Sequence, residues 1–429
     1  MSSNLSTLTD RVRPRGRVEE GRRRGPRLPV VLLLLAGALL LLSVVRAVTD
    51  QQSVTSPDQW GAALTVAAPI ALAGLGGLWA ERAGVINIGL EGMMILGLFT
   101  AGAVGWQYGP WAAVAAGVAG GALGGLLHAV ATVSFGVDHI VSGVAINISV
   151  PGIVQYLAKL WFAAEGSEAA ARGGTDGESP QMERMEPFSV PGLSGWLGDL
   201  DERDWFLVSD AAGILRAAVH EVSWLTLITV LLFVGSYLVL WRSAFGLRLR
   251  SCGENPEAAE SLGVNVYLYK YAALIVSGGL AGLGGGYLAV LVRRYLEGQA
   301  DGRGYLGLAT MIFGNWRPAG VASGAGLFGF MDVLQTRDPS VVHAMLLLFA
   351  LALLSYVGWL LYRGRRTAAL TTGAIGGLLW VWYAVTDSLP PELVEAIPYL
   401  TTLLVLTLFA QRLRPPKAIG RRYRRGEGG

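Results

Sequence analysis

Long apolar runs separated by short polar stretches follow one another along most of this 429-residue chain. A helix needs about 20 apolar residues to cross about 30 Å of bilayer hydrocarbon, because each residue advances it by about 1.5 Å. The length of the runs therefore predicts membrane-spanning helices. The runs lie near residues 30–45, 60–79, 84–106, 110–133, 138–162, 223–241, 270–292, 305–335, 343–362, 368–386 and 397–411. We expect an all-α, polytopic integral membrane protein with about ten to twelve transmembrane segments.

The run at 305–335 is too long for a single span, and the sequence Gly-Asn-Trp-Arg-Pro interrupts it at 314–318. Proline has no backbone N–H and clashes with the preceding helical turn, so it breaks a helix at this point. Backbone that leaves the helix at membrane depth must be covered by protein or line a cavity. We expect a broken or re-entrant segment near 305–318, with two helical pieces that meet on the cytoplasmic side.

The distribution of arginine predicts the orientation of the spans, because cytoplasmic loops carry an excess of Lys and Arg. With a cytoplasmic N-terminus, the arginines near 82, 242–250, 317, 363–366 and 412–425 all face the cytoplasm. This predicts a multi-pass protein of the bacterial cytoplasmic (inner) membrane with both termini in the cytoplasm. The chain then divides into a basic disordered tail at 1–29, a transmembrane domain at 30–411 and a basic tail at 412–429.

In this orientation the polar segment at 164–222, which is rich in Asp and Glu, lies outside the cell. We therefore expect an acidic external loop there. Arg293 and Arg294 are the exception to the charge pattern, since they fall at the external end of a span. Their side chains are expected to snorkel toward polar surroundings or to fold into an external cap.

The composition supports a membrane protein. Apolar residues make up 52% of the chain and charged residues only 15%, which leaves too little polar surface to cover a soluble globule. The 59 glycines lie largely within apolar runs, where small residues let helices pack closely. Two stripes with glycine at every fourth position predict close helix crossings: Gly117, Gly121 and Gly125, and Gly278, Gly282 and Gly286.

The chain carries no sequence signal for catalysis or for a resident metal. Its single cysteine, Cys252, excludes an internal disulfide and a cysteine-built metal site, and its four histidines have no ligand spacing. No GK[ST] follows the glycines at 284–286, and no GxSxG or HExxH motif is present. The net charge of +3 comes from the ends and short loops, so it indicates topology and no nucleic-acid partner. We expect no enzyme activity and no cofactor on this chain.

The polar loop at 242–269 contains a candidate lever between two spans. Asn255 before Pro256 suits the start of a helix, and Gly263 suits its end. This predicts a short helix of about two turns beside the membrane, through which a soluble partner could move both adjoining spans. The alternative is an ordinary connecting loop. The candidate residues are Gly253, Glu254, Asn255, Pro256, Glu257, Ala258 and Ala259.

Four polar residues within apolar runs are candidates for a transport pathway or its gating: Asn87, Glu91, Asn147 and Asp332. A carboxylate inside the membrane is costly and usually faces a cavity or a paired group. Glu91 is expected about 10 Å into the span that begins near residue 84, by helical rise. The alternative for each residue is a structural pairing with a neighbouring side chain or backbone group.

Several sequence blocks occur in order along residues 60–335: ERAGVINIGLEGMM, GVDHIVSGVAIN, FGLRLRSCGENPEAAESLGVNV, SGGLAGLGGGYL, GRGYLGLATMIFGNWRP and FGFMDVLQ. Together they resemble the permease family of bacterial ABC importers for simple sugars, branched-chain amino acids and nucleosides. The NIGLEG and GENPEAA segments are most similar to the nucleoside-type branch. RPPKAIGRRY near the C-terminus resembles the family's ending.

The resemblance implies a permease subunit that translocates a nucleoside or a related small sugar-containing solute, with simple sugars and then branched-chain amino acids as alternatives. It implies that residues 253–259 contact a separate ABC ATPase subunit, which binds ATP and Mg. It further implies two other partners, a second homologous permease and an external lipid-anchored solute-binding protein.

Two segments depart from the family's pattern, the long acidic loop at 164–222 and an inserted pair of spans at 343–386. A different class of protein also stays open at this point. A self-contained secondary transporter or channel, driven by a gradient through Glu91 and Asp332, would show the same apolar pattern and would need no ATPase. An integral membrane enzyme would need a catalytic cluster that the sequence lacks.

Overall fold

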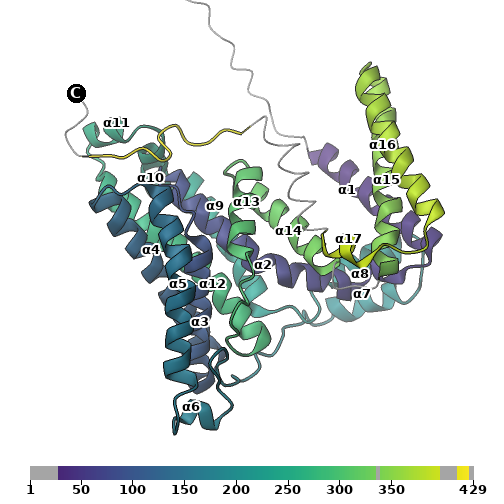
Figure 1. The fold of residues 1–429 in the computed structure, drawn as a ribbon. Coiled ribbons are helices and arrows are strands. Elements are labelled where there is room, and N and C mark those ends of the chain that lie inside the picture. The colour runs from purple at the N-terminus through teal and green to yellow at the C-terminus, as the bar shows by residue number, and fades with distance from the viewer. Residues whose placement is uncertain (1–27, 335–338, 397–412, 425–429) are drawn as a thin grey trace, which may run out of the picture.

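The computed structural model describes residues 28–334, 339–396 and 413–424. Within these ranges the regular structure is helical, and the only β contacts are isolated bridges. Figure 1 shows long helices joined mostly by short connections. The expected all-α fold class is confirmed.

The helices fall into two groups by length. The long helices are α1 (Leu28–Thr49), α2 (Pro57–Arg82), α3 (Leu90–Tyr108), α4 (Pro110–Ala129), α5 (His139–Phe162), α9 (Trp224–Arg242), α12 (Val266–Val292), α14 (Pro318–Leu334), α15 (Pro339–Tyr362) and α16 (Arg366–Val385). The short helices are η1 (Gln52–Val54), η2 (Val130–Ser134), α6 (Glu168–Ala171), α7 (Leu193–Asp201), α8 (Val208–Arg216), α10 (Ala244–Glu254), α11 (Pro256–Ser261), α13 (Arg303–Phe313) and α17 (Pro391–Glu395).

Eight helical segments in the described part of the chain are long and apolar enough to cross a membrane. The predicted spans at 84–106 and 305–335 also contain helices, α3 and the pair α13 and α14, although α14 has only 17 residues. The predicted run at 397–411 lies outside the described residues. The chain is thus a multi-pass membrane protein, and its total number of spans stays a prediction.

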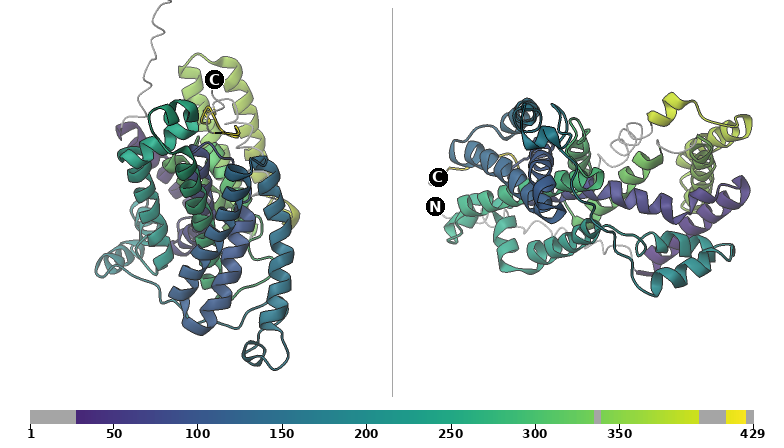
Figure 2. Two further views of the ribbon diagram at one scale, coloured as in Figure 1. Left: turned by 90° about the vertical axis from the view of Figure 1, so that its left-hand side faces the viewer. Right: turned by 90° about the horizontal axis from the view of Figure 1, so that it is seen from below.

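Glycine stripes let the central helices approach one another closely. A Cβ atom added at Gly121 would overlap the Gly278 carbonyl oxygen, and one at Gly282 would overlap that of Gly117. Gly97 on α3 also meets Gly282, so three helices converge there. Two further views show α3, α4, α5 and α12 in one bundle (Figure 2). The close crossings predicted from both stripes are confirmed.

A second group of helices lies apart from this bundle, at the right of Figure 1. There α15 packs against α16 and α1. The long helix α2 joins the two groups, because it contacts α12 and α13 in the bundle and α8 near its own start. The predicted inserted spans correspond to α15 and α16 of this second group.

The predicted break near residue 314 is confirmed. α13 ends at Phe313, α14 begins at Pro318, and Asn315 and Trp316 between them both have a φ of 53°. This left-handed conformation is unfavourable for a large side chain, so tertiary contacts must hold it. Trp316 is only 5% exposed, which shows that the surrounding helices enclose it.

One predicted span begins later than expected. Residues 84–89, which we call the non-helical segment, separate α2 from α3, and Gly84 has a φ of 85°. Glu91 therefore lies in the first turn of α3, and the expectation that it lies about 10 Å along a helix starting near 84 is wrong. The backbone can leave the helix here because side chains of other helices bond its polar groups.

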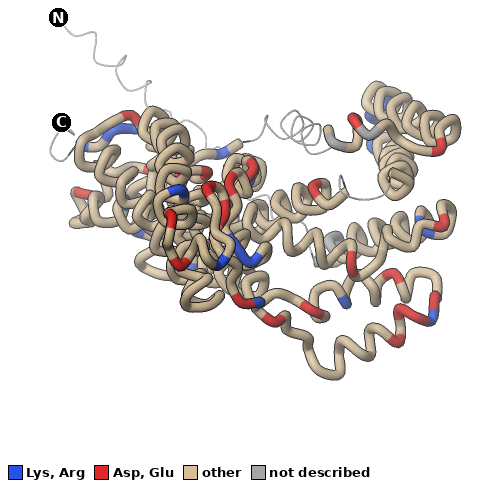
Figure 3. Tube along the Cα trace, turned by 60° about the horizontal axis from the view of Figure 1, so that its bottom comes forward, with Lys and Arg blue, Asp and Glu red and all other residues tan. Residues whose placement is uncertain are grey.

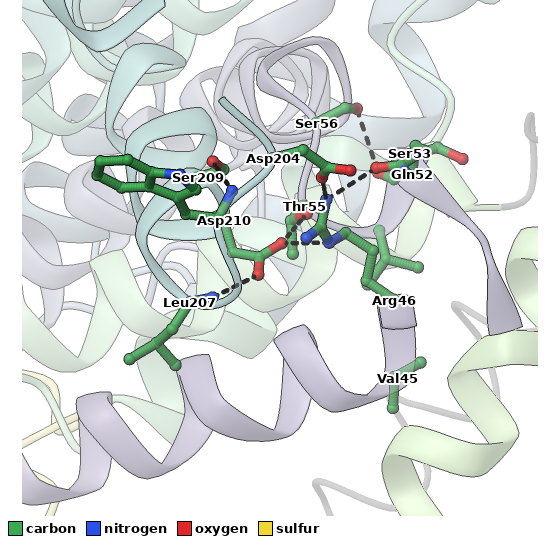
Figure 4. Close-up of polar contacts among 12 residues, drawn as sticks. Val45, Arg46, Gln52, Ser53, Thr55, Ser56, Asp204, Leu207, Ser209 and Asp210 are labelled. Carbon is green, nitrogen blue, oxygen red and sulfur yellow. Dashed lines mark hydrogen bonds and ion pairs between the residues drawn. The ribbon is translucent and has the colours of Figure 1, made fainter. Parts of the chain in front are cut away.

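The acidic segment at 164–222 contains α6, α7 and α8, and acidic residues lie along it (Figure 3). Arg46, near the end of α1, anchors it: Nε lies 2.8 Å from Asp210 Oδ1, and Nη1 lies 2.5 Å from Asp204 Oδ1 (Figure 4). Thr55 Oγ1 donates a further hydrogen bond of 2.6 Å to Asp210 Oδ1. Since Asp210 is buried, these contacts fix the position of α8 relative to α1.

Arg293 and Arg294, the exceptions to the charge pattern, contact the same acidic segment nearer its start. The Arg294 guanidinium lies 2.5 Å from Glu178 Oε2. Met182 N donates a hydrogen bond of 2.8 Å to the Arg293 carbonyl, and Arg293 Nε donates one of 3.2 Å to the Met182 carbonyl. The two arginines therefore fold against the acidic segment, as a cap would require, and the position of this cap outside the cell stays a prediction.

Candidate functional site

The carboxylate of Glu91 holds the N-terminus of α13. Oε1 accepts a hydrogen bond of 3.0 Å from Gly302 N, and Oε2 accepts one of 2.7 Å from Gly304 N. The first N–H groups of a helix have no partner within it, and the helix dipole favours a negative charge at that end. Glu91 is 6% exposed and lies in the first turn of α3, so the N-terminal ends of two helices meet at one carboxylate.

Arg303 extends this contact to α14. Its Nη2 lies 3.2 Å from Asp332 Oδ2, and the two side chains are 19% and 16% exposed. Residues 302–304 therefore lie between the carboxylates of Glu91 and Asp332. Two of the predicted pathway or gating residues converge in this way on one helix end.

The two predicted asparagines bond the non-helical segment to its surroundings. Asn147 Nδ2 donates to the Ile88 carbonyl at 2.9 Å, and Asn147 Oδ1 accepts from Gly92 N at 2.8 Å. Asn87 Nδ2 donates to Ser277 Oγ on α12 at 2.9 Å. The Asn147 amide thus bonds backbone N–H and C=O groups that would bond within the chain if the helix were continuous. We call the set Asn87, Glu91, Asn147, Asp332 and residues 302–304 the Glu91 site.

His128 and Ser142 also support the non-helical segment, and the sequence does not single them out. His128 Nε2 lies 3.0 Å from the Ile86 carbonyl and must donate to it, since a carbonyl oxygen only accepts. His128 Nδ1 lies 2.9 Å from Ser142 Oγ. No sequence motif relates a histidine on α4 to a serine on α5. Their contact is visible only once the two helices are packed together.

The predicted short helix in the loop at 242–269 is confirmed as α11. Asn255 Oδ1 accepts a hydrogen bond of 3.0 Å from Ala258 N, and Pro256 is its first residue. Gly263, with a φ of 81°, follows the end of the helix. The loop also contains α10, which the sequence pattern does not predict. Gly253 and Glu254 lie at the end of α10.

One side of α11 is open and the other is attached to the bundle. Glu257 and Ala258 on α11 are exposed, as is Glu254 at the end of α10, whereas Pro256 and Ala259 are buried. α11 packs against α10 and α12 and lies at one end of the molecule, at the upper left of Figure 1. The arrangement presents an acidic surface to which a partner could bind, on a helix that is itself held firmly. We call residues 253–259 the coupling surface.

The break between α13 and α14 is fixed to the end of α2. Trp316 Nε1 donates to Glu81 Oε2 at 2.5 Å, and Arg82 Nε donates to the Trp316 carbonyl at 3.0 Å. The Arg82 guanidinium also lies 5.3 Å from the centroid of the Trp241 ring. The sequence alone singles out the positive charge of Arg82, which indicates the orientation of the span, and gives Glu81 no separate role. Their contact with Trp316, 235 positions away from Glu81, is a tertiary feature.

No group of three or more His, Cys, Asp or Glu side chains that could hold a metal ion occurs among the residues that the structure describes. Burial raises the pKa of the Cys252 thiol to about 11, so this side chain is neutral near pH 7. Cys252 packs as a small apolar residue in the core around α10.

Comparison with known proteins places the chain among transporter subunits. A family model described as the permease component of branched-chain amino acid transport systems matches residues 60–357. The chain is 32% identical to the guanosine ABC transporter permease protein NupQ of Bacillus subtilis over 376 residues, which cover 85% of this chain and 96% of NupQ. It is 31% identical to the nucleoside ABC transporter permease protein NupC of Lactococcus lactis over 371 residues, which cover 84% of this chain and 94% of NupC.

A third relative is named for a sugar. The candidate glucose ABC transporter permease protein TsgC13 of Haloferax volcanii is 30% identical over 373 residues, which cover 85% of this chain and 96% of TsgC13. No solved structure matches the chain significantly. The family match spans both the Glu91 site and the coupling surface.

Proposed function

This chain belongs to the family of permease components of branched-chain amino acid transport systems and is a membrane-spanning permease subunit of an ABC importer, and on that basis we propose that it carries a nucleoside or a related small sugar-containing solute. The similarity to two nucleoside permeases over 85% and 84% of the chain is the observation that supports this solute class. Simple sugars are the first alternative, because the third relative is named for glucose. Branched-chain amino acids follow, from the description of the family.

The proposal includes partners that supply what this chain lacks. A separate ABC ATPase subunit binds ATP and Mg and drives transport from the cytoplasmic side. A second homologous permease completes the translocation path, and an external lipid-anchored solute-binding protein delivers the solute. The chain lies in the bacterial cytoplasmic membrane with both termini in the cytoplasm, and the segment at 164–222 faces the outside.

The coupling surface is the proposed contact for the ATPase. The side chains of Glu254 and Glu257 are exposed, and Glu254 Oε2 also accepts a long hydrogen bond of 3.4 Å from Lys417 N. The buried Pro256 and Ala259 attach α11 to the body of the protein. A short helix with one buried face moves as a rigid unit, because shifting it alone would expose apolar surface. Displacement of α11 is therefore passed to α10 and α12, against which it packs.

The Glu91 site is the proposed gate. Transporters commonly place discontinuous helices at the point where the path opens and closes, with a helix N-terminus facing a negative group. Here the N-terminus of α13 faces Glu91, and the non-helical segment lies directly before α3. Asn87, Asn147 and Asp332 hold these elements in one arrangement, and exchange of their bonds would release it.

Purification of the tagged full-length chain in mild detergent, followed by reconstitution with its partners, tests the function. We expect co-purification of an ATPase and a second permease, and ATP-dependent uptake of radiolabelled guanosine into liposomes at about ten times the rate for glucose or leucine. If glucose or leucine is taken up faster than guanosine, the solute is a sugar or a branched-chain amino acid and the nucleoside proposal is wrong. A chain that purifies alone and moves solute under an ion gradient would identify a secondary transporter or channel.

The coupling surface is tested in the same liposomes. Glu254→Ala combined with Glu257→Ala should lower ATP-driven uptake while the protein still inserts into the membrane, because two exposed carboxylates of the contact are lost. Glu202→Ala, which removes an exposed carboxylate from the acidic segment, is the matched control and should leave coupling to the ATPase unchanged. Equal uptake by the double variant and the control would contradict the assignment of residues 253–259.

A further inference from the structure

The last described segment, residues 413–424, lies across the end of the molecule that carries α10 and α11 (yellow in Figure 1). We call it the C-terminal strap. Arg414 N donates a hydrogen bond of 2.8 Å to Asn315 Oδ1, in the break between α13 and α14. Ala418 N donates one of 2.9 Å to the Gly253 carbonyl, at the end of α10. The strap thus bonds two elements that are distant in sequence.

A third bond connects the strap to the non-helical segment. Gly420 N donates a hydrogen bond of 3.1 Å to the Gly84 carbonyl. The fit is close: a Cβ atom at Gly84 would lie 3.1 Å from Gly253 Cα and 3.4 Å from the Ala418 carbonyl oxygen. Gly420 has a φ of 73°, and a Cβ there would lie 2.9 Å from Ile86 Cδ1. A larger residue at either glycine would have to hold a left-handed backbone conformation and displace a neighbouring atom.

Side chains of the strap add to the attachment. Leu413, Ile419 and Tyr423 pack against the apolar core that contains Cys252. The Tyr423 ring centroid lies 5.6 Å from that of Tyr267 on α12. Ala418 is 4% exposed, so its backbone bond to Gly253 is shielded from water. Apolar burial and shielded hydrogen bonds indicate a docked segment rather than a tail lying loosely on the surface.

The three residues that the strap bonds all adjoin the coupling surface or the Glu91 site. Gly253 belongs to the coupling surface. Gly84 opens the non-helical segment, and Glu91 lies just beyond its other end. Asn315 follows the C-terminal end of α13, and Glu91 holds the N-terminal end of the same helix. The strap therefore joins the coupling surface to both of the elements that meet at Glu91.

We propose that the C-terminal strap is a second coupling element, which transmits movement of α10 and α11 to the Glu91 site by holding Gly253, Gly84 and Asn315 together as one unit. This inference rests on the proposed function, because it assigns a route for the force that an ATPase applies to the coupling surface. Gly253 also packs against the Arg82 carbonyl at the end of α2, and Arg82 in turn bonds the Trp316 carbonyl in the α13–α14 break. The strap adds a second, direct link from the end of α10 to this break, so without it less of a displacement of α11 would reach the break.

The first experiment measures the docking of the strap and does not depend on transport. Cys252 is the only cysteine, is fully buried and precedes Gly253, so its alkylation by a small maleimide reports opening at the end of α10. Ala418→Pro removes the N–H that bonds Gly253, and Gly420→Ala forces a Cβ against Ile86. We expect both to raise the alkylation rate about three- to tenfold, as for one lost hydrogen bond.

Gly364→Ala is the matched control for Gly420→Ala. Gly364 also has a positive φ, 72°, but it lies between α15 and α16 with nothing within 4 Å of an added Cβ. It carries the same backbone strain without a contact to displace, so Cys252 should react at the wild-type rate. If Cys252 reacts no faster in the two strap variants than in this control, the strap is not docked as described and the proposal fails.

The second experiment measures solute imported per ATP hydrolysed, in liposomes that contain the full complex. We expect Ala418→Pro and Gly420→Ala to keep the ATPase bound and hydrolysing ATP, while uptake per ATP falls about five- to tenfold, because less of the movement of α11 reaches the Glu91 site. A merely structural strap would lower the amount of folded complex without changing this ratio. An unchanged ratio in variants whose Cys252 reacts faster therefore refutes the coupling role and leaves the proposed function intact. A wild-type chain that binds no ATPase would refute both.

Discussion

Gly304 has no room for a side chain because Glu91 occupies the space: a Cβ atom there would lie 2.6 Å from both Glu91 Cα and Glu91 Oε2. The same closeness lets Glu91 accept the Gly304 N–H at 2.7 Å. The two residues belong to the first turns of α3 and α13, so their contact sets the separation of two helix ends. Substitutions at either residue should therefore affect stability and transport together.

Gly304→Ala tests this contact. Alanine is more favourable than glycine inside a helix by about 1 kcal/mol, but overlap with the Glu91 backbone should outweigh that gain. We expect the variant to lower the free energy of unfolding by about 1–3 kcal/mol and to lose most solute uptake. Thermal unfolding in detergent, followed by circular dichroism, gives the first readout. Gly326→Ala in α14, where an added Cβ meets nothing within 4 Å, is the control and should be at least as stable as wild type.

The ion pair between Arg303 and Asp332 should contribute measurably, because its side chains are only 19% and 16% exposed. A double-mutant cycle with Arg303→Ala and Asp332→Ala is expected to give a coupling free energy of about 1–2 kcal/mol. The exposed pair of Arg172 and Glu168, with side chains 60% and 66% exposed, is the control and should give about 0.5 kcal/mol or less. Equal coupling energies for the two pairs would contradict the burial of the first.

The stability of the fold should depend on the ionisation of Cys252. Burial disfavours the thiolate and raises the pKa of this thiol from 9.0 to about 11 in the folded protein. Because the unfolded chain releases this proton first, the contribution of Cys252 to folding stability is full below about pH 9 and falls as the pH rises toward 11. Unfolding of the wild type and of Cys252→Ser in detergent, between about pH 7 and about pH 10, measures this loss. The wild type should lose more free energy of unfolding over this range than Cys252→Ser, and an equal loss in both would contradict the raised pKa.

Asp210→Ala should loosen the acidic segment. The change leaves Arg46 without its buried partner, and breaking such a pair by removing one member costs about 3 kcal/mol. We expect faster cleavage by trypsin at the arginines of residues 164–222 in proteoliposomes that expose this face. Asp199→Ala, which removes an exposed carboxylate from the same segment, serves as the control. Cleavage at the same rate in both variants would rule out the Arg46 anchor.

Local signals explain the parts of the fold that the amino-acid sequence predicts. The length of the apolar runs predicts the spanning helices, and Pro318 with the polar residues before it predicts the break that follows α13. Asn255, Pro256 and Gly263 predict both ends of α11, since capping depends on residues a few positions apart. The glycine stripes predict the crossings of α4 with α12, because a missing side chain allows close approach whatever the partner helix is.

The Glu91 site and the strap depend on contacts that local patterns do not encode. The apolar sequence around 84–89 is compatible with a helix, and the backbone leaves it only because Asn147, His128 and neighbouring groups from other helices bond its polar atoms. Glu91 holds the end of a helix that begins 212 residues later, at Arg303. The packing of α3 beside α13 decides which backbone N–H groups this carboxylate bonds. Sequence sets the elements and their ends, whereas tertiary packing decides which buried polar groups become partners, because each must find a hydrogen bond wherever the folded chain offers one.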